Sequence, residues 1–269
     1  MPSGVLRGRD HTGGGRIAAI AEGQAAVALS RGGAPKAYAH KDPNEDGAAF
    51  ARGDAGYLLV VADAHGGHEA AEIAVDLLIE CFAPEWTASS GLLLPWPELA
   101  RRAAGQAHAA ILDRAARGGN LESRTTLAFA LVRPREDWLA WASVGDSHVF
   151  RVDAAETAEL TCPGPEPVHF LGSPSRTLET LEIRIDSQAL GGTRALVLAT
   201  DGLSEHGIGV DSPHEAVSAA VVHAKLAKPE LRALVAARHL LEQALAAQRS
   251  HHSGDNVAAA LYWAKGSAG

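Results

Sequence analysis

The sequence predicts an α+β fold in which an antiparallel sheet system is covered by helices on the outside. The chain has 269 residues, of which 46% are apolar, and this suits one large domain or two small ones. Helical segments precede a block of strands, and further helices precede the last strand. This order differs from the regular β-α-β alternation of a doubly wound parallel sheet.

Each element is predicted from the spacing of its apolar residues. A continuous apolar run of strand length lies at residues 57–63, and further strands are predicted at 25–30, 126–132, 138–144, 148–152, 181–185, 195–200 and 256–263. Apolar residues at helical spacing predict helices over 68–82, 98–116, 212–226 and 231–248. Segments rich in Gly, Pro and other loop-forming residues predict loops at 31–50 and 84–97. We expect residues 1–15 to form a flexible tail and residues 16–265 to form a single domain.

Composition argues against several classes of protein. The formal net charge of −8 leaves no broad basic surface, so we expect no nucleic-acid partner. The two cysteines, Cys81 and Cys162, cannot build a disulfide framework, which fits a reduced, cytoplasmic setting. The N-terminal segment lacks the apolar core of a secretory signal, and no apolar run approaches the ~18 residues of a membrane span. We therefore expect no membrane partner. The acidic excess indicates either clustered cation ligands or an acidic surface.

Carboxylates gather at the predicted ends of strands. One strand ends on Asp63, two later strand ends carry Asp146 and Asp201, and Asp255 comes just before the last strand. A bare carboxylate at the tip of a buried strand is unfavourable unless a partner neutralises it. Several carboxylates together would also repel one another without cations. This pattern predicts a shared cation site.

The chemistry of these side chains favours particular ions. All-oxygen ligands select hard cations such as Mg²⁺ or Mn²⁺ over Zn²⁺. Two such ions can lower the pKa of a shared water and hold a phosphoryl group for in-line attack. Glu45 and Asp46, in the segment "NEDGAAF", complete the set of candidate ligands. The alternative interpretation is that each acid is a cap or a turn residue.

Two histidines follow Asp63 directly. The spacing of His65 and His68 could begin a zinc site, but no cysteine or second histidine cluster completes one. Their position beside Asp63 indicates instead that one of them transfers protons. His65 lies closer to the strand end and is the candidate, whereas His68 is expected to open the following helix.

Six short motifs, in this order, resemble those of the metal-dependent serine/threonine protein phosphatases of type 2C, as found in bacteria. They cover nearly the whole chain and are "NEDGAAF", "DAHGG", "SRTT", "VGDSHVF", "ATDGLSE" and "GDNVAAALYW". The resemblance implies a four-layer α-β-β-α sandwich of two antiparallel sheets flanked by helices. It also implies a binuclear Mg²⁺ or Mn²⁺ site where the sheets meet at one end.

The resemblance implies a role for each candidate residue. Asp63 would bridge both ions, and the carbonyl of Ala64 would bind one of them; Ala stands here where the family usually has Gly. Glu45 or Asp46 would hold an ion directly or through water, with Asp46 favoured for the direct role.

The remaining acids would complete the site. Asp201 and Asp255 would hold the other ion, and Asp146 with Asp201 would form a third, weaker metal position. His65 would protonate the leaving oxygen. Lys41 stands where the family commonly has the Arg that grips the substrate phosphate, but an ordinary loop lysine is the alternative.

Two departures from the family pattern affect the substrate side. Arg124 replaces the Gly of the Ser-Gly-Thr-Thr motif, either as a structural change, the favoured interpretation, or as a new cation near the substrate. Bacterial relatives usually carry a flap subdomain here, which is shortened in this chain. Pro163, Pro165 and Pro167 indicate a short, stiff connector in its place.

The leading hypothesis is a metal-dependent phosphatase that hydrolyses phosphoserine and phosphothreonine in proteins with a metal-activated water. Its partner would be a phosphoprotein, such as a bacterial serine/threonine kinase or a target of that kinase. One alternative is a pseudo-phosphatase that binds a phosphoprotein without turnover. Another is a phosphatase for small phosphate esters, because a site without much of a flap should be open.

Overall fold

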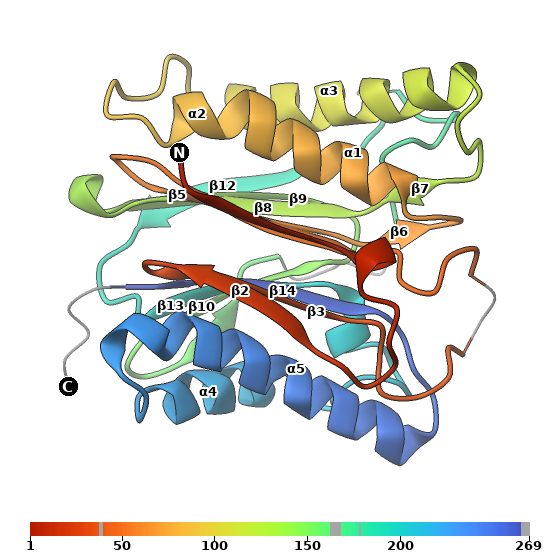
Figure 1. The fold of residues 1–269 in the computed structure, drawn as a ribbon. Helices are drawn as coiled ribbons and strands as arrows, with labels where there is room; N and C mark the ends of the chain where they lie inside the picture. Colours follow the sequence, from red (N-terminus) through yellow and green to blue (C-terminus); the bar gives the residue numbers. More distant parts are fainter. Residues whose placement is uncertain (38–39, 162–167, 178, 265–269) are drawn as a thin grey trace.

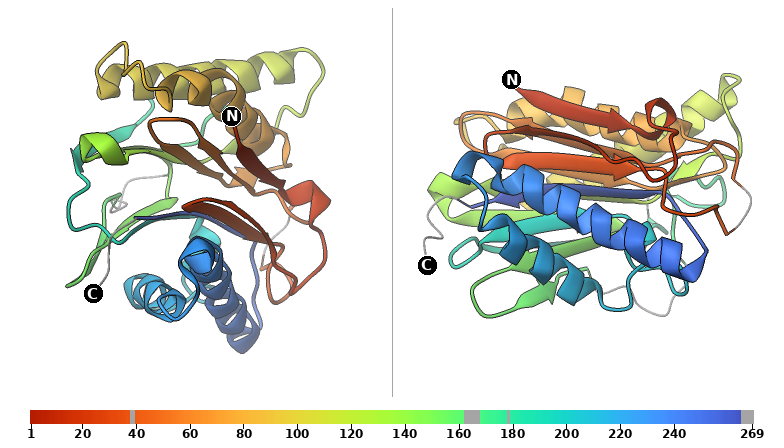
Figure 2. Two further views of the ribbon diagram at one scale, coloured as in Figure 1. Left: turned by 60° about the vertical axis from the view of Figure 1, so that its left-hand side comes forward. Right: turned by 60° about the horizontal axis from the view of Figure 1, so that its bottom comes forward.

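Two antiparallel sheets face each other in the computed structural model, and helices cover both outer faces (Figures 1 and 2). The structure describes residues 1–37, 40–161, 168–177 and 179–264. This arrangement confirms the predicted α+β sandwich of four layers. None of the helices in these ranges combines the length and the hydropathy that a membrane span requires.

The first sheet has six strands. In spatial order they are β1 (Ser3–Arg7), β4 (Gly47–Arg52), β5 (Tyr57–Ala62), β8 (Leu127–Arg133), β9 (Trp138–Val144) and β12 (Arg184–Ala189). Its outer face is covered by α1 (Glu69–Leu77), a π-helical turn (Leu78–Phe82), α2 (Ala83–Trp86) and α3 (Trp96–Ala116). Acidic Glu69 and Glu72 lie in the first turn of α1, where negative charge stabilises a helix.

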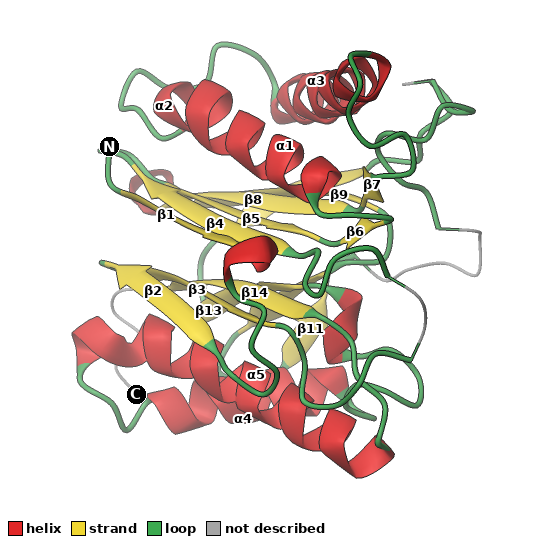
Figure 3. Cartoon of the chain, turned by 45° about the vertical axis from the view of Figure 1, so that its right-hand side comes forward, coloured by secondary structure: helices red, strands yellow, loops and turns green. Residues whose placement is uncertain are grey.

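The second sheet also has six strands. In spatial order they are β11 (Thr157–Glu159), β10 (His148–Val152), β13 (Ala195–Ala199), β14 (Val257–Trp263), β3 (Ala25–Ser30) and β2 (Ala18–Glu22). Its outer face is covered by α4 (Pro213–Ala224) and α5 (Arg232–His251). A small ladder of β6 (Ala64–His65) and β7 (Arg124–Thr125) lies at one end of the sandwich (Figure 3).

Alternating residues of the central strands fill separate cores. In β5, Leu59 and Val61 pack between the two sheets, whereas Leu58 and Val60 pack against the helices of the first sheet. All four side chains are fully buried. A strand buried on both faces needs a continuous apolar run, which explains why the period-two signal is absent from "YLLVVA". Rigid, doubly covered strands hold the residues at their ends in fixed positions.

The structure corrects the prediction of a flexible N-terminal tail. Residues 3–7 form β1, which pairs with β4 in register from Ser3 opposite Ala51 to Arg7 opposite Gly47. Leu6 is buried between the sheets. The segment was missed because only two consecutive residues, Val5 and Leu6, are large and apolar.

Other element boundaries also differ from the prediction. The expected loop at 31–50 ends in β4, and the expected loop at 84–97 contains α2 and the start of α3. The strand expected at 181–185 lies at Arg184–Ala189, because an edge strand with exposed residues needs little apolar character. The short connector expected at Pro163–Pro167 lies outside the described residues.

Leu6→Ala tests whether the N-terminal segment is part of the fold. Leu6 is 6% exposed, so its truncation leaves a cavity and should lower the free energy of unfolding by about 2–5 kcal/mol. Denaturant unfolding measures this change. The matched control is Leu93→Ala, because Leu93 is 76% exposed and should tolerate the change. Equal stability of the two variants would favour a flexible tail.

Candidate metal centre

Five aspartates converge at the end of the sandwich that carries β6 and β7. Asp46 precedes β4 and Asp63 follows β5, and these neighbouring antiparallel strands meet in register at this end. In the second sheet Asp201 follows β13 and Asp255 precedes β14. Asp146 lies in the turn between β9 and β10, which joins the two sheets. The topology therefore brings together acids that are far apart in the sequence.

Three of these aspartates are almost completely enclosed. Asp46 is 1% exposed, Asp63 is 7% exposed and Asp255 is 6% exposed. The hydroxyl of Thr200 at the end of β13 donates to Oδ2 of Asp46 over 2.9 Å, so it links the second sheet to the first. The hydroxyl of Thr125 donates to the backbone carbonyl of Asp63 over 2.9 Å. These contacts fix the backbone and one carboxylate oxygen, and they leave other oxygens without a partner.

The charges of the five aspartates act on one another. Burial and the charges of Asp63 and Asp255 raise the pKa of Asp46 well above its usual range. Burial and the charges of Asp63, Asp146 and Asp255 do the same to the pKa of Asp201. The pKa of Asp146 is raised by burial and by Asp63. Neighbouring carboxylates that are both ionised repel each other and destabilise the folded state unless cations neutralise them.

Asp63 is the exception in this group. Burial alone would raise its pKa, but contacts with His65, Asp201 and Asp46 outweigh burial and lower the pKa of Asp63. Asp63 therefore gives up its proton more readily than Asp46, Asp146 and Asp201, whose pKa values are raised.

Buried carboxylate oxygens without a hydrogen-bond partner indicate that these residues fit a divalent ion. Among the described residues, four buried oxygens of these aspartates form no hydrogen bond: Oδ1 of Asp46, Asp146 and Asp201, and Oδ2 of Asp63, which lies 3.4 Å from Nε2 of His65 in an ion pair. Buried polar atoms without a partner are costly and uncommon in folded proteins. Carboxylate oxygens that need a cation are the ligands that Mg²⁺ and Mn²⁺ prefer. The donor set therefore fits such an ion.

Among the described residues, no three His, Cys, Asp or Glu side chains are arranged around one point as metal ligands would be. Three of the acids have partners within the protein instead. Asp46 is held by Thr200, Asp63 lies 3.4 Å from His65, and Asp255 lies 3.2 Å from the ammonium of Lys36.

Lys36 is a component of this centre that the sequence analysis missed. Its side chain is 7% exposed, and its ammonium lies 3.2 Å from Oδ1 of Asp255. The same charge lowers the pKa of Asp46 against the effect of burial. The backbone on either side of Lys36 is tied to Gly254, which donates to Pro35 over 2.7 Å and accepts from Ala37 over 3.1 Å. No local motif marks Lys36, because only the fold brings it to Asp255.

Glu45 is directed toward its own loop. Its Oε1 accepts the backbone N–H groups of Lys41 over 3.0 Å and of Asp42 over 2.8 Å. Its backbone N–H donates to Oδ1 of Asn256, which follows Asp255. This geometry is that of a residue that shapes the loop before Asp46. The role of Glu45 as a metal ligand, directly or through water, stays a prediction.

His65 stands at the edge of the aspartate group. Its side chain is 35% exposed, and Nε2 lies 3.4 Å from Oδ2 of Asp63. The ring packs edge-on against Phe170, with centroids 4.8 Å apart. Burial would lower the pKa of His65, but Asp63, Asp146 and Asp255 outweigh burial and raise it. His65 is therefore an imidazole with increased proton affinity that reaches solvent.

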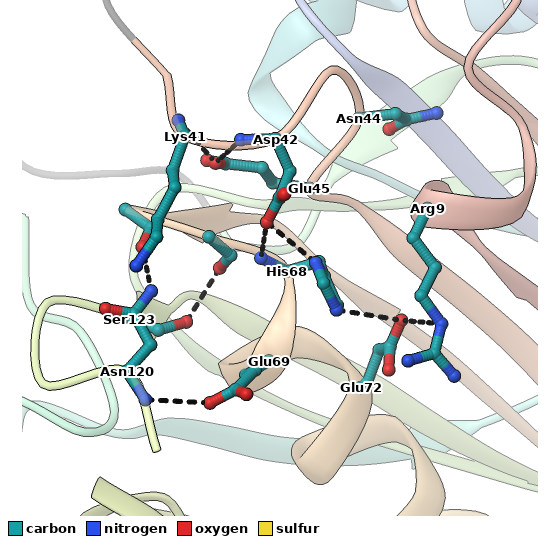
Figure 4. A network of polar contacts seen from close by, with 12 residues as sticks. Arg9, Lys41, Asp42, Asn44, Glu45, His68, Glu69, Glu72, Asn120 and Ser123 are labelled. Atoms are coloured by element: carbon teal, nitrogen blue, oxygen red, sulfur yellow. Dashed lines mark hydrogen bonds and ion pairs between the residues drawn. The ribbon is translucent and has the colours of Figure 1, made fainter. Parts of the chain in front are cut away.

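His68 belongs to a separate polar network that ties the loop before Asp46 to α1 (Figure 4). Nδ1 of His68 lies 2.7 Å from Asp42, and its Nε2 lies 4.0 Å from Glu72. Nε of Arg9 lies 3.1 Å from Oε1 of Glu72, the same oxygen that faces His68. The network explains why His68 follows Asp63 so closely in sequence without joining the aspartates, as expected for a residue that opens the helix.

Lys41 and Ala64 are the remaining two residues that were predicted to line the site. The side chain of Lys41 extends toward Asn120 (Figure 4), and it passes beside Gly67. No ion pair of Lys41 occurs within the part of the chain that the structure describes. Ala64 lies in β6 with ordinary strand backbone angles, so the methyl group causes no strain where the family usually has Gly.

Comparisons with known proteins agree with this architecture. The protein phosphatase 2C family matches residues 34–249 of the 269. A crystal structure of a bacterial serine phosphatase is 20% identical with a TM-score of 0.67, and covers 91% of this chain and 99% of its own. Stp1, a serine/threonine phosphatase from Staphylococcus aureus, is 20% identical with a TM-score of 0.63, over 91% of this chain and 96% of its own.

A third similar structure contains bound manganese. The catalytic domain of the serine/threonine protein phosphatase PstP, in complex with 2 manganese ions, is 22% identical with a TM-score of 0.59, over 92% of this chain and 97% of its own. No curated protein matches in a sequence comparison. The family match spans most of the chain, and the sheets, helices and motif order agree with it. The chain belongs to the protein phosphatase 2C family.

Proposed function

We propose that this protein is a metal-dependent phosphatase that hydrolyses phosphoserine and phosphothreonine monoesters in proteins. The observation that carries the proposal is the group of buried aspartates with unpartnered oxygens, placed beside a partly exposed histidine. Family membership and the manganese-bound relative support it. A binding protein without turnover would gain nothing from so many destabilising carboxylates.

We assign two Mg²⁺ or Mn²⁺ ions to the aspartates of the centre. Asp63 lies at the centre and is suited to bridge them, with the carbonyl of Ala64 beside it. Asp46, Asp201 and Asp255 surround Asp63. Bound ions of this kind activate water and neutralise phosphoryl oxygens. Glu45 acts one step outward, because it fixes the loop that carries Asp46.

Asp146 suits a third and weaker position. It lies in the β9–β10 turn, its Oδ1 has no hydrogen-bond partner, and the charge of Asp63 raises its pKa. Its carboxylate thus faces the group from the side of the turn, together with Asp201. An ion held there would have fewer protein ligands than the central pair and would exchange more readily.

His65 is suited to protonate the departing serine or threonine oxygen. Its proton affinity is raised by the neighbouring aspartates, and its exposed edge faces solvent, from which substrate arrives. Asp63 keeps the ring charged until the proton is transferred. Lys41 would attract the substrate phosphate from the neighbouring turn as a point charge, since ammonium lacks the bidentate fork of Arg.

The partner would be a phosphoprotein, and a bacterial serine/threonine kinase or one of its targets fits this role. A reduced, cytoplasmic setting is consistent with Cys81, which is a free and exposed thiol.

Hydrolysis of a phosphothreonine peptide tests the proposal. The protein should release phosphate with Mn²⁺ or Mg²⁺ and lose this activity in EDTA. Asp63→Asn should lower the rate by more than about 100-fold, since loss of an outer partner of a metal ligand alone costs about 10–100-fold. The matched control is Asp211→Asn, because Asp211 is exposed and remote from the group.

The outcomes separate the alternatives. Turnover of p-nitrophenyl phosphate without turnover of the peptide would indicate a small-ester phosphatase. No turnover of either substrate by folded protein that binds Mn²⁺ would indicate a pseudo-phosphatase. Equal rates of Asp63→Asn and the wild-type protein would reject the proposed centre.

A further inference from the structure

A pocket of about 460 Å³ lies on the outer side of His65. Besides His65 it is lined by Leu121, Glu122 and Arg124 on one side and by Gly172–Ser175 on the other. None of the five aspartates of the metal centre lines it. The pocket and the metal centre therefore meet at His65 and at no other proposed catalytic group.

Arg124 is positioned beside His65 by the small ladder. Arg124 in β7 is the direct cross-strand partner of His65 in β6, and side chains of paired residues lie on the same face of a ladder. Both also contact one aromatic ring. The guanidinium carbon of Arg124 lies 5.0 Å from the centroid of Phe170, and the ring of His65 packs edge-on against the same residue. Phe170 thus orients both side chains at the pocket.

The guanidinium group of Arg124 contacts the ring of Phe170 but no acidic side chain of the described residues. Arg124 is exposed, and within the described ranges no acidic side chain forms an ion pair with it. Arg114 and Arg117, which precede it in the same region, pair with Glu69 and Asp113. Arg124 instead presents its guanidinium fork to a pocket, and such a fork matches the geometry of a carboxylate.

We propose that this pocket binds the peptide segment next to the phosphorylated residue, and that Arg124 binds an acidic side chain of that segment. The inference rests on the proposed function, in which His65 protonates the leaving oxygen. The phosphoryl group then lies on the aspartate side of His65, and the peptide continues on the other side, into the pocket. The exposed Leu121 offers an apolar contact to the same segment.

The size and charge of the pocket set the substrate class. A volume of about 460 Å³ admits a short stretch of peptide and not a folded domain. Glu122 lines the pocket as well, so its carboxylate repels an acidic substrate residue that does not reach Arg124. The expected substrates are phosphopeptides with an acidic residue adjacent to the phosphorylated one.

A charge reversal tests this inference. Two phosphothreonine peptides, identical except for Asp or Lys residues flanking the phosphothreonine, are compared by kcat/KM, each rate being divided by that for p-nitrophenyl phosphate. The wild-type protein should prefer the acidic peptide on the order of tenfold. Arg124→Glu should reverse the preference, and Glu122→Gln should strengthen it. Arg135→Glu is the matched control, because Arg135 is exposed on the turn after β8.

Two results would overturn the proposal. One is equal use of both peptides by the wild-type protein, and the other is an unchanged preference in Arg124→Glu. Fluorescence anisotropy of both peptides bound to Asp63→Asn gives the same comparison without turnover. If no substrate is hydrolysed, but Asp63→Asn still binds the acidic peptide more tightly and the double variant with Arg124→Glu binds the basic peptide more tightly, the pocket proposal is supported. The proposed hydrolase function is then rejected. Loss of preference in both assays rejects the pocket alone.

Discussion

Asp201→Asn is expected to abolish phosphoester hydrolysis and, in the same protein, to raise the melting temperature measured in EDTA. Burial and the charges of Asp63, Asp146 and Asp255 raise the pKa of Asp201 well above its usual range. Its ionised form therefore destabilises the metal-free fold at every pH above that raised pKa. The amide removes this charge, and we expect a gain on the order of 1 kcal/mol, or about 2–4 °C for a chain of this size.

The sign of the pH dependence gives a second readout. As the pH falls from the raised pKa of folded Asp201 toward the ordinary pKa of an unfolded aspartate, the destabilisation declines, and it is gone only below the ordinary pKa. The advantage of Asp201→Asn in EDTA should therefore be largest at mildly alkaline pH and should shrink under mildly acidic conditions. Differential scanning fluorimetry at both pH values measures it, with Asp211→Asn as the exposed control. A variant that is less stable in EDTA and still active would show that Asp201 is only a turn residue.

Lys36→Met is expected to make the stability of the protein depend on divalent metal. The ammonium of Lys36 is buried against Asp255, and removing one partner of a buried ion pair costs about 3–5 kcal/mol. The melting temperature in EDTA should therefore fall on the order of 10 °C. Mn²⁺ should restore most of this loss, because the ion then takes over the neutralisation of Asp255 and Asp46.

The same variant should bind Mn²⁺ more tightly, since the ion no longer competes with an ammonium group for Asp255. Melting curves at increasing Mn²⁺ concentration measure both effects. Lys228→Met is the matched control, because Lys228 is exposed and should respond to neither EDTA nor Mn²⁺. Weaker Mn²⁺ binding by Lys36→Met would contradict this account and would assign Lys36 the role of orienting Asp255 for the metal.

The strands that carry Asp63 and Asp201 could be predicted because they are buried on both faces. Such strands are continuous apolar runs, and their ends are visible where Asp63 and Asp201 follow them. The N-terminal strand and the strand at Gly47–Arg52 could not be found this way. The N-terminal strand pairs with a strand that is distant in sequence and has only Val5 and Leu6 as large apolar residues, and the strand at Gly47–Arg52 is buried but has Phe50 as its only large apolar residue among small ones.

The acidic residues of the candidate site could be predicted from the sequence, but the residues that pair with them could not. Asp63 and Asp255 stand out locally, but Lys36 is joined to Asp255 only by the tertiary fold. Glu45 illustrates the opposite case. Its motif predicted a metal ligand, directly or through water, and the structure gives its Oε1 to two backbone donors, which a sequence pattern cannot reveal.

The central claim is that the buried aspartates form a divalent-metal centre. Isothermal titration of Mn²⁺ into EDTA-stripped protein, with wild-type and Asp201→Asn samples side by side, tests it most directly. We predict saturable binding of two ions by the wild-type chain and loss of at least one of them in Asp201→Asn. No binding by the folded wild-type protein, or identical isotherms for both proteins, would contradict the account.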